Sequence, residues 1–247
     1  MEKVCQLSVC PHDTAKNLAG WYLLNTYLQR RLVCNIHFNL QESFIVERET
    51  VLKGGYHLVY ANPYSAMEFA EKLNFIPVAR PIGVFDEVVL VCRKGTKPLE
   101  LAAPKVSTAT KGLIVHALGC MELRKLGKDA NACEFIIAGN HMKAAQAVIK
   151  GEADIGFVFN ETWQGMSAVS KDSLEVIAES REGNAFHCFC ICPEWADRKA
   201  DLLKVFIGMQ TDESGARILE DLKFKGFEPV PDNTIALLEK IVAQTRA

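Results

Sequence analysis

Three hydroxyl side chains stand together in PKVSTATKGLIVHAL (residues 104–118), where an apolar strand gives way to a helix. They belong to Ser107, Thr108 and Thr110, and Lys111 follows them. The first turn of a helix has unpaired backbone N–H groups and a partial positive charge, so it attracts anions, and hydroxyls there add hydrogen-bond donors. The segment therefore predicts an anion site, with simple N-capping by Ser or Thr as the alternative. The GxxxxGK[ST] spacing of a P-loop is missing.

A second candidate segment is AGNHMKAAQAVIKGEADIGFVFNETW (residues 138–163). His141 stands at the start of its helix, and Asn160 and Glu161 follow its apolar strand. Ligands of open α/β sheets bind beyond the carboxyl ends of the strands, so these three side chains can converge on one site. The alternative for His141 is a local cap or a surface position.

A third candidate is YANPYSAME (residues 60–68), where Tyr64 again follows a strand and opens a helix. Proline is common at the first position of a helix, so the alternative is a Pro-initiated helix whose tyrosine only packs.

HCFCIC (residues 187–192) raises the possibility of a metal cluster. On a strand, Cys188, Cys190 and Cys192 share one face, with neighbours roughly 6.6 Å apart along the chain. Two thiolates on one tetrahedral zinc need sulfurs roughly 3.8 Å apart. We therefore predict a buried strand here, and the sequence predicts neither a metal ligand nor a cofactor elsewhere.

Composition excludes several classes of partner. Apolar residues make up 49% and charged residues 23% of the 247, and the net charge is −2. Such a chain has no general attraction for nucleic acid or anionic lipid. No apolar run approaches the roughly 20 residues needed to span a bilayer, so no membrane insertion is expected.

The compartment is inferred from the N-terminus and the cysteines. MEKVCQLSVCPHD has no apolar signal core and no small-residue cleavage site, and the nine cysteines are odd in number without a CxxC pair. We expect a cytoplasmic protein with reduced thiols. The alternative is a periplasmic protein whose signal peptide has been removed.

Strand and helix patterns alternate along the chain. The expected strands are 4–10, 34–40, 56–62, 75–82, 86–94, 133–139, 153–160, 174–180 and 186–195. The expected helices are 14–28, 43–53, 65–73, 112–127, 141–151, 200–222 and 233–244. Such alternation predicts an α/β protein with mostly parallel sheets. The Pro- and Thr-rich segment 95–112 has the composition of a crossing into a second lobe.

In their order, several segments resemble the phosphate/phosphonate-binding solute-binding proteins of ABC transporters, over about residues 6–235. They are LSVCPHDTAKNLAGWYLLNTYLQRRL, YANPYSAMEFAE, PKVSTATKG, HMKAAQAVIKGEADIGFVFNETW and DLLKVFIGMQTDESGARILEDLKFKGFEPVPD. The resemblance implies a two-lobed, type II periplasmic-binding-protein fold. Each lobe would hold a mixed, mostly parallel sheet flanked by helices, with the ligand cleft between lobes. The expected lobes are 1–90 with 187–247, and 91–186.

The resemblance also implies the ligand contacts. The family's anion lies on the loop that matches Ser107–Thr110, and the residues that match Tyr64, His141, Asn160 and Glu161 add further contacts. The loop after the first strand, which here contains His12, lines the cleft as well. This chain departs from the family where Ala109 interrupts the run of hydroxyl residues and Lys111 precedes Gly112.

Two functions follow as hypotheses. The first is a substrate-binding protein that closes by hinge motion on phosphate, phosphonate or phosphite and serves a transporter permease or a sensor kinase. The second is a cytosolic enzyme on the same fold, of the menaquinone- or thiamin-precursor type, acting on a small organic acid. The sequence contains no nucleophile–base pair that requires catalysis, so no catalytic residue is assigned.

Overall fold

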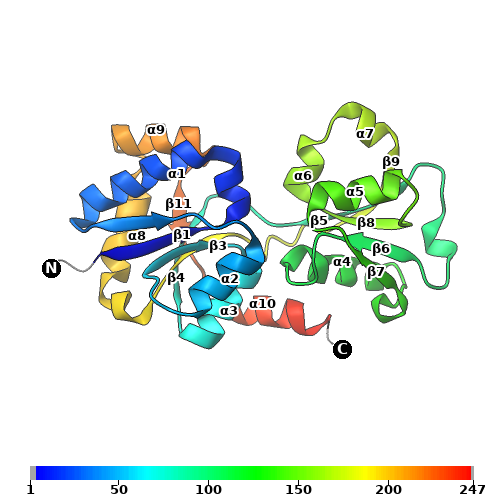
Figure 1. The fold of residues 1–247 in the computed structure, drawn as a ribbon, viewed down its shortest axis with the longest axis horizontal. Helices are drawn as coiled ribbons and strands as arrows, with labels where there is room; N and C mark the ends of the chain where they lie inside the picture. The colour runs from blue at the N-terminus through cyan, green and yellow to red at the C-terminus, as the bar shows by residue number, and fades with distance from the viewer. Residues whose placement is uncertain (1–3, 246–247) are drawn as a thin grey trace. The chain divides into compact units, whose positions relative to one another are not determined.

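The structure is a computed structural model that describes residues 4–245, and the chain forms two compact units (Figure 1). Unit 1 contains the described residues up to Val84 together with Phe186–Ile235, and unit 2 contains Phe85–Ala185 and the residues from Ala236. Each unit holds one mixed sheet flanked by helices, as expected for the two-lobed binding-protein fold. Within the described range, no helix combines the length and apolar character needed to cross a bilayer.

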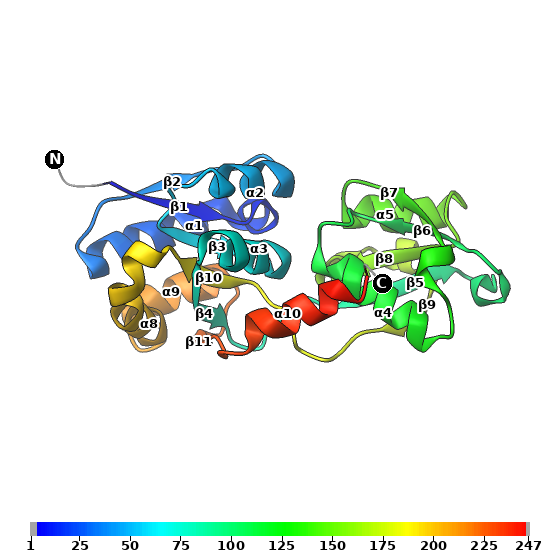
Figure 2. The same ribbon diagram turned by 90° about the horizontal axis from the view of Figure 1, so that it is seen from below.

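Unit 1 is built on a six-stranded sheet in the order β11-β4-β10-β3-β1-β2. Its strands are β1 (Cys5–Val9), β2 (Ile36–Asn39), β3 (Leu58–Ala61), β4 (Ile76–Pro81), β10 (Cys188–Ile191) and β11 (Phe227–Pro229). Its helices are α1 (Pro11–Leu32), α2 (Phe44–Leu52), α3 (Pro63–Leu73), α8 (Lys199–Gly208) and α9 (Glu213–Asp221). Helix α1 packs against α8 and α9, and α2 packs against α3 (Figures 1 and 2).

Strand β10 confirms the buried strand predicted for HCFCIC. It lies antiparallel between β3 and β4, and all of its residues are buried. Phe189 contacts the ring of Trp21 at a centroid distance of 6.2 Å, inside an aromatic core. The spacing expected for the sulfurs was wrong, because the Sγ atoms of Cys188 and Cys190 lie 3.6 Å apart. Backbone rise does not set this distance, since rotation about χ1 moves each sulfur along the strand.

Unit 2 is built on a five-stranded sheet in the order β7-β6-β8-β5-β9. Its strands are β5 (Val88–Arg93), β6 (Lys105–Thr108), β7 (Glu134–Ile137), β8 (Ile155–Phe159) and β9 (Leu174–Glu179). Its helices are α4 (Ile114–Lys125), α5 (His141–Ile149), α6 (Asn160–Gly165) and α7 (Ala168–Asp172). Strands β6, β7 and β8 run parallel, and β5 is antiparallel to both β8 and β9.

The observed division differs from the expected lobes at the first boundary, which follows Val84 and not residue 90, so that all of β5 belongs to unit 2, and it differs again in the last helix. Helix α10 (Thr234–Ala243) begins in unit 1, but the residues from Ala236 group with unit 2. The guanidinium of Arg124, in α4, donates to the backbone oxygen of Gln244, which ties the end of the chain to unit 2.

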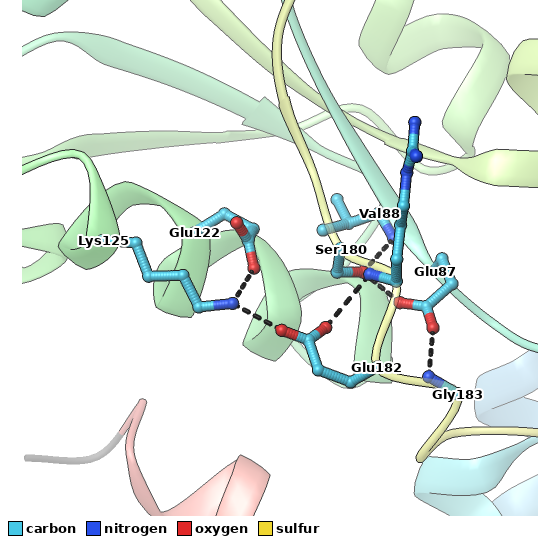
Figure 3. A network of polar contacts seen from close by, with 8 residues as sticks. Glu87, Val88, Glu122, Lys125, Ser180, Glu182 and Gly183 are labelled. Carbon is cyan, nitrogen blue, oxygen red and sulfur yellow. Dashed lines mark hydrogen bonds and ion pairs between the residues drawn. The ribbon is translucent and has the colours of Figure 1, made fainter.

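A polar network fixes the segments that enter and leave unit 2 (Figure 3). The Glu87 carboxylate accepts from the Ser180 hydroxyl and from the Gly183 N–H at 2.7 Å, and the Val88 N–H donates to Ser180 Oγ at 3.0 Å. Lys125 joins the network to α4, because its ammonium contacts both Glu122 and Glu182. These contacts hold residues 87–88 beside residues 180–183 within the unit.

Candidate functional site

Polar side chains gather at one edge of the unit 1 sheet, where three strands place them. Strands β1 and β3 run parallel, so Cys10 and Asn62 follow them at the same edge. Strand β10 is antiparallel to β3, with Cys188 paired to Ala61, so His187 enters the sheet at that edge too. The Cys10 N–H donates to the Tyr60 carbonyl at 2.8 Å, which holds the start of α1 against β3.

Cys10, Asp13 and His187 form a compact cluster at this edge. One ligand atom from each residue lies within 4.8 Å of the other two, and Nε2 of His187 is 3.3 Å from Oδ2 of Asp13. Cys10 is fully buried and His187 is 7% exposed, with its ring stacked on Tyr60 at 5.6 Å. Burial raises the pKa of the Cys10 thiol to about 11, although His187 opposes the shift. A thiol that holds its proton at neutral pH is a poor nucleophile, so the cluster does not favour the enzyme hypothesis.

A buried carboxylate lies under the same edge. Glu47, on α2, is 0% exposed, and Oε1 accepts from the Ser8 hydroxyl at 3.2 Å. Its second oxygen, Oε2, has no hydrogen-bond partner within residues 4–245. Burial raises the pKa of Glu47 to about 8, against the opposing effects of the Ser8 hydrogen bond and of His187. The Glu47 carboxyl therefore holds its proton at neutral pH.

The two residues expected to contact ligand in unit 1 lie beside this cluster. Tyr64 is half-buried on the first turn of α3, and the Arg48 guanidinium covers its ring at 4.6 Å. His12 is half-buried on the first turn of α1, 6.5 Å from the Phe44 ring. Asn62 caps α3 by accepting from the Ser65 N–H at 3.0 Å, so the Pro-initiated helix read from the sequence is present.

The candidates of unit 2 lie together at the carboxyl edge of its parallel strands. Thr108 ends β6, His141 follows β7, and β8 leads directly into Asn160 and Glu161. His141 is buried with its ring 5.6 Å from Phe159, at the end of β8. Glu161 is exposed. The parallel register explains why segments distant in sequence meet here.

Two of these candidates have their polar atoms engaged inside the unit. The Ser107 hydroxyl is buried and donates toward the Ala144 carbonyl at 2.7 Å, with the Ile155 carbonyl at 3.3 Å. The Asn160 amide donates to the Phe85 carbonyl at 3.1 Å and accepts from the Glu87 N–H at 3.3 Å. Both side chains therefore hold neighbouring segments together at the carboxyl edge of the unit 2 sheet.

Thr108 is different, because its hydroxyl makes no hydrogen bond to any described residue. The residue is 1% exposed, and Oγ1 has no hydrogen-bond partner in the part of the chain that the structure describes. A buried hydroxyl without a partner costs free energy, so an external acceptor would stabilise it. Thr110 is half-buried, and its Oγ1 accepts from the Gly112 N–H at 3.3 Å, which leaves its proton for another acceptor.

The helix after these hydroxyls begins without a side-chain cap. Helix α4 has Leu113 at its N-cap, and leucine has no group that can accept a hydrogen bond. Ser107, Thr108 and Thr110 therefore do not cap it, and the N-capping alternative does not hold. The first N–H groups of this 12-residue helix, with the positive end of its dipole, are suited to an anion.

Sequence reasoning missed the unit 1 cluster. From the sequence, we do not single out Cys10, Asp13, Glu47 or His187 as a site. HCFCIC contains His187, but its local pattern predicts only a buried strand and not a contact of His187 with another segment. The contact with Asp13 depends on the antiparallel insertion of β10, which no local pattern reveals.

Comparison with known proteins places the chain among binding proteins. Residues 7–234 match the model of a family described as ABC transporter, phosphonate, periplasmic substrate-binding protein. The search of curated proteins found no significant match.

Several solved structures share the fold. XAC2383 from Xanthomonas citri, bound to chloride, has a TM-score of 0.80 at 15% identity, covering 99% of this chain and 98% of that one. PhnD1 from Prochlorococcus marinus, in complex with methylphosphonate, has a TM-score of 0.77 at 16% identity with the same coverage. The binding protein PA3383 of a phosphonate transporter from Pseudomonas aeruginosa has 0.74 at 13%, covering 100% and 87%.

Proposed function

Since the chain belongs to the phosphonate substrate-binding proteins of ABC transporters, we propose that it captures a small oxyanion and delivers it to a transporter permease. The ligand class is phosphate, phosphonate or phosphite. One of the structures that share the fold was solved with methylphosphonate, which supports this class.

The observation that carries the proposal is the carboxyl edge of unit 2. There a buried Thr108 hydroxyl without a partner in the described chain lies one short loop before the uncapped start of α4. A tetrahedral oxyanion accepts hydrogen bonds from both kinds of donor. Thr110 adds a second hydroxyl, and His141 from α5 lies at the same edge. We propose these three side chains as ligand contacts, together with Glu161, and with Tyr64 and His12 from unit 1.

Ser107 and Asn160 are proposed to act on the site indirectly. Their hydrogen bonds inside unit 2 hold β6 to α5 and the end of β8 to residues 85–87. Each therefore orients the backbone from which the contacting groups project.

Calorimetry tests the proposal directly. The protein is unfolded and refolded to remove carried-over ligand, then titrated with orthophosphate, methylphosphonate and phosphite, with sulfate and methanesulfonate as matched tetrahedral comparators. We expect one site per chain for at least one phosphorus oxyanion, and weaker binding of the sulfur analogue of the same shape. Absence of binding for all three phosphorus compounds would overturn the proposal.

The cysteines support a proposal about the compartment. The family description is periplasmic, yet the nine cysteines form no disulfide within residues 4–245. Seven of the nine are buried, and the sulfurs of Cys188 and Cys190 lie 3.6 Å apart without a disulfide bond. We propose that the protein works where thiols stay reduced. Fractionation of cells that make the protein, with thiol alkylation before lysis, tests this, and recovery in the periplasm with oxidised cysteines would refute it.

A further inference from the structure

The cluster of Cys10, Asp13 and His187 has the composition of a metal site. It combines a thiol, an imidazole and a carboxylate within 4.8 Å, and these are the ligand types that zinc takes from proteins. The three come from two distant parts of the chain, the start of α1 and the residue before β10. Burial of Cys10 and His187 keeps competing water from two of the ligands.

The distances are close to those that zinc requires. With Zn–S of about 2.3 Å and Zn–N and Zn–O of about 2.0–2.2 Å, tetrahedral ligand atoms lie about 3.3–3.7 Å apart. The His187–Asp13 pair is already at 3.3 Å. The widest possible separation in the cluster is 4.8 Å, so a shift of about 1 Å, within reach of side-chain rotation, completes the geometry.

Charged groups of both signs surround the cluster. Asp13 also contacts the Lys16 ammonium at 3.6 Å through its other oxygen, which is a longer and partly exposed contact. Deeper in, the fully buried Glu47 has one oxygen without a hydrogen-bond partner among the described residues. Cys10, Asp13 and Glu47 thus share this edge with His187, and the Arg48 guanidinium pairs with Glu68 at 3.0 Å.

We propose that Cys10, Asp13 and His187 bind one divalent cation of the zinc class in unit 1, with Glu47 as the outer carboxylate. Binding replaces the thiol proton by the metal and sets the positions of α1 and β10 relative to each other. The inference rests on residues other than the proposed oxyanion contacts, of which His12 and Tyr64 lie beside the cluster, and the metal titration tests it without any oxyanion.

Cobalt(II) is a suitable probe, since thiolate ligation gives it an intense near-ultraviolet charge-transfer band and tetrahedral geometry gives it visible bands. Protein freed of metal with a chelator, and kept reduced, is titrated with Co²⁺ and then with Zn²⁺. We expect one equivalent of Co²⁺ to produce both signals and Zn²⁺ to remove them. Zinc-edge X-ray absorption of the wild-type protein is expected to show one sulfur ligand with nitrogen and oxygen ligands.

Variants identify the ligands. Cys10→Ser is expected to abolish the charge-transfer band, and Asp13→Asn and His187→Gln to weaken cobalt binding at least tenfold. Cys190→Ser is the matched control, because its sulfur lies 3.6 Å from Cys188 in the alternative thiol pair. Circular dichroism verifies the fold of each variant.

Two results would overturn the inference. One is a wild-type protein without a charge-transfer band at any Co²⁺ concentration, which would leave the cluster a hydrogen-bonded network. The other is a band lost in Cys190→Ser and kept in Cys10→Ser, or two sulfur ligands in the absorption spectrum, either of which would move the metal to Cys188 and Cys190.

Discussion

Ser107 and Thr108 are neighbours in sequence whose hydroxyls have opposite surroundings. The Ser107 hydroxyl is engaged with a backbone carbonyl, and the Thr108 hydroxyl has no hydrogen-bond partner among the described residues. Thr108→Val removes that hydroxyl at constant shape, so we expect unchanged or slightly higher stability. Loss of a hydrogen bond to a charged ligand costs roughly 1.5–3 kcal/mol, so anion affinity is expected to fall about 10- to 100-fold by calorimetry.

Ser107→Ala is the matched variant with the reverse expectation. It removes a buried hydrogen bond, so the free energy of unfolding in urea is expected to fall by about 1 kcal/mol. The anion affinity of the folded protein is expected to fall less than in Thr108→Val, since the Ser107 hydroxyl is bonded to the Ala144 carbonyl and acts on the site only through the backbone that it orients. If Ser107→Ala lost affinity and Thr108→Val kept it, the two assignments would have to be exchanged.

His116 makes the stability of unit 2 depend on pH. Burial on α4, with a smaller effect of Lys111, lowers its pKa from 6.5 to about 4. The unfolded chain takes up a proton below about pH 6.5 and the folded chain does not, so stability is fully present above pH 6.5 and is lost toward pH 4. Between pH 7.5 and 4.5 we expect His116 alone to lower the free energy of unfolding by about 2.5 kcal/mol.

Urea unfolding at several pH values measures this effect. His116→Leu removes the titrating ring and is expected to flatten the pH dependence by that amount. His37→Gln, at an exposed position on β2, is the control and should retain the wild-type slope. Equal slopes in wild type and His116→Leu would show that His116 takes up a proton over the same pH range in the folded and the unfolded protein.

At the scale of elements, the packing of α4 on β8 depends on a glycine. A Cβ built on Gly119 would lie 2.4 Å from the Phe157 ring, so the two elements meet more closely than alanine allows. Gly119→Ala is expected to destabilise the protein by about 1–3 kcal/mol through overpacking, although alanine favours the helix by up to about 1 kcal/mol.

Two further variants isolate the cause. Gly165→Ala, where nothing lies within 4 Å of the added Cβ, should change stability by less than about 0.5 kcal/mol. Phe157→Leu combined with Gly119→Ala should recover part of the loss, seen as a favourable coupling in a double-mutant cycle. Strict additivity of the two changes would indicate a backbone effect of the alanine instead.

Local patterns were sufficient to predict most elements. The alternation of apolar strands and helices predicts β1, β3 and β8 within one or two residues, because buried strands are short and mostly apolar. The position of Thr108 and His141 at strand ends was also accessible, since a strand–helix junction is a local signal. What the pattern could not supply was pairing. The insertion of β10 between β3 and β4, which brings His187 to Asp13, depends on contacts between distant segments.

The chemical roles of single atoms were less accessible still. Ser107 and Thr108 are equivalent hydroxyls in the sequence, and only their positions on β6 separate them. Asn160 follows a strand as a ligand contact would, yet its amide is engaged with residues 85 and 87. Side-chain direction and competing backbone acceptors decide these roles, and both are properties of the folded chain.

For the whole molecule, binding of an oxyanion is expected to raise the free energy of unfolding. A ligand that binds the folded chain alone adds about 2.7 kcal/mol to the free energy of unfolding at 100 times its dissociation constant. For a chain of this size 1 kcal/mol corresponds to about 2–4 °C, so the unfolding midpoint is expected to rise by about 5–11 °C. Each further tenfold increase in ligand adds about 1.4 kcal/mol, so the midpoint should keep rising after the site is saturated.

This continued rise separates specific binding from a salt effect, which should be the same for sodium sulfate at equal ionic strength. Thr108→Val should follow the wild-type curve displaced to about 10- to 100-fold higher ligand, because the variant changes affinity and leaves the fold intact. Scanning calorimetry over three decades of methylphosphonate concentration measures both curves. A midpoint that rises equally with methylphosphonate and sulfate, or equally in wild type and Thr108→Val, would contradict an anion site at the start of α4.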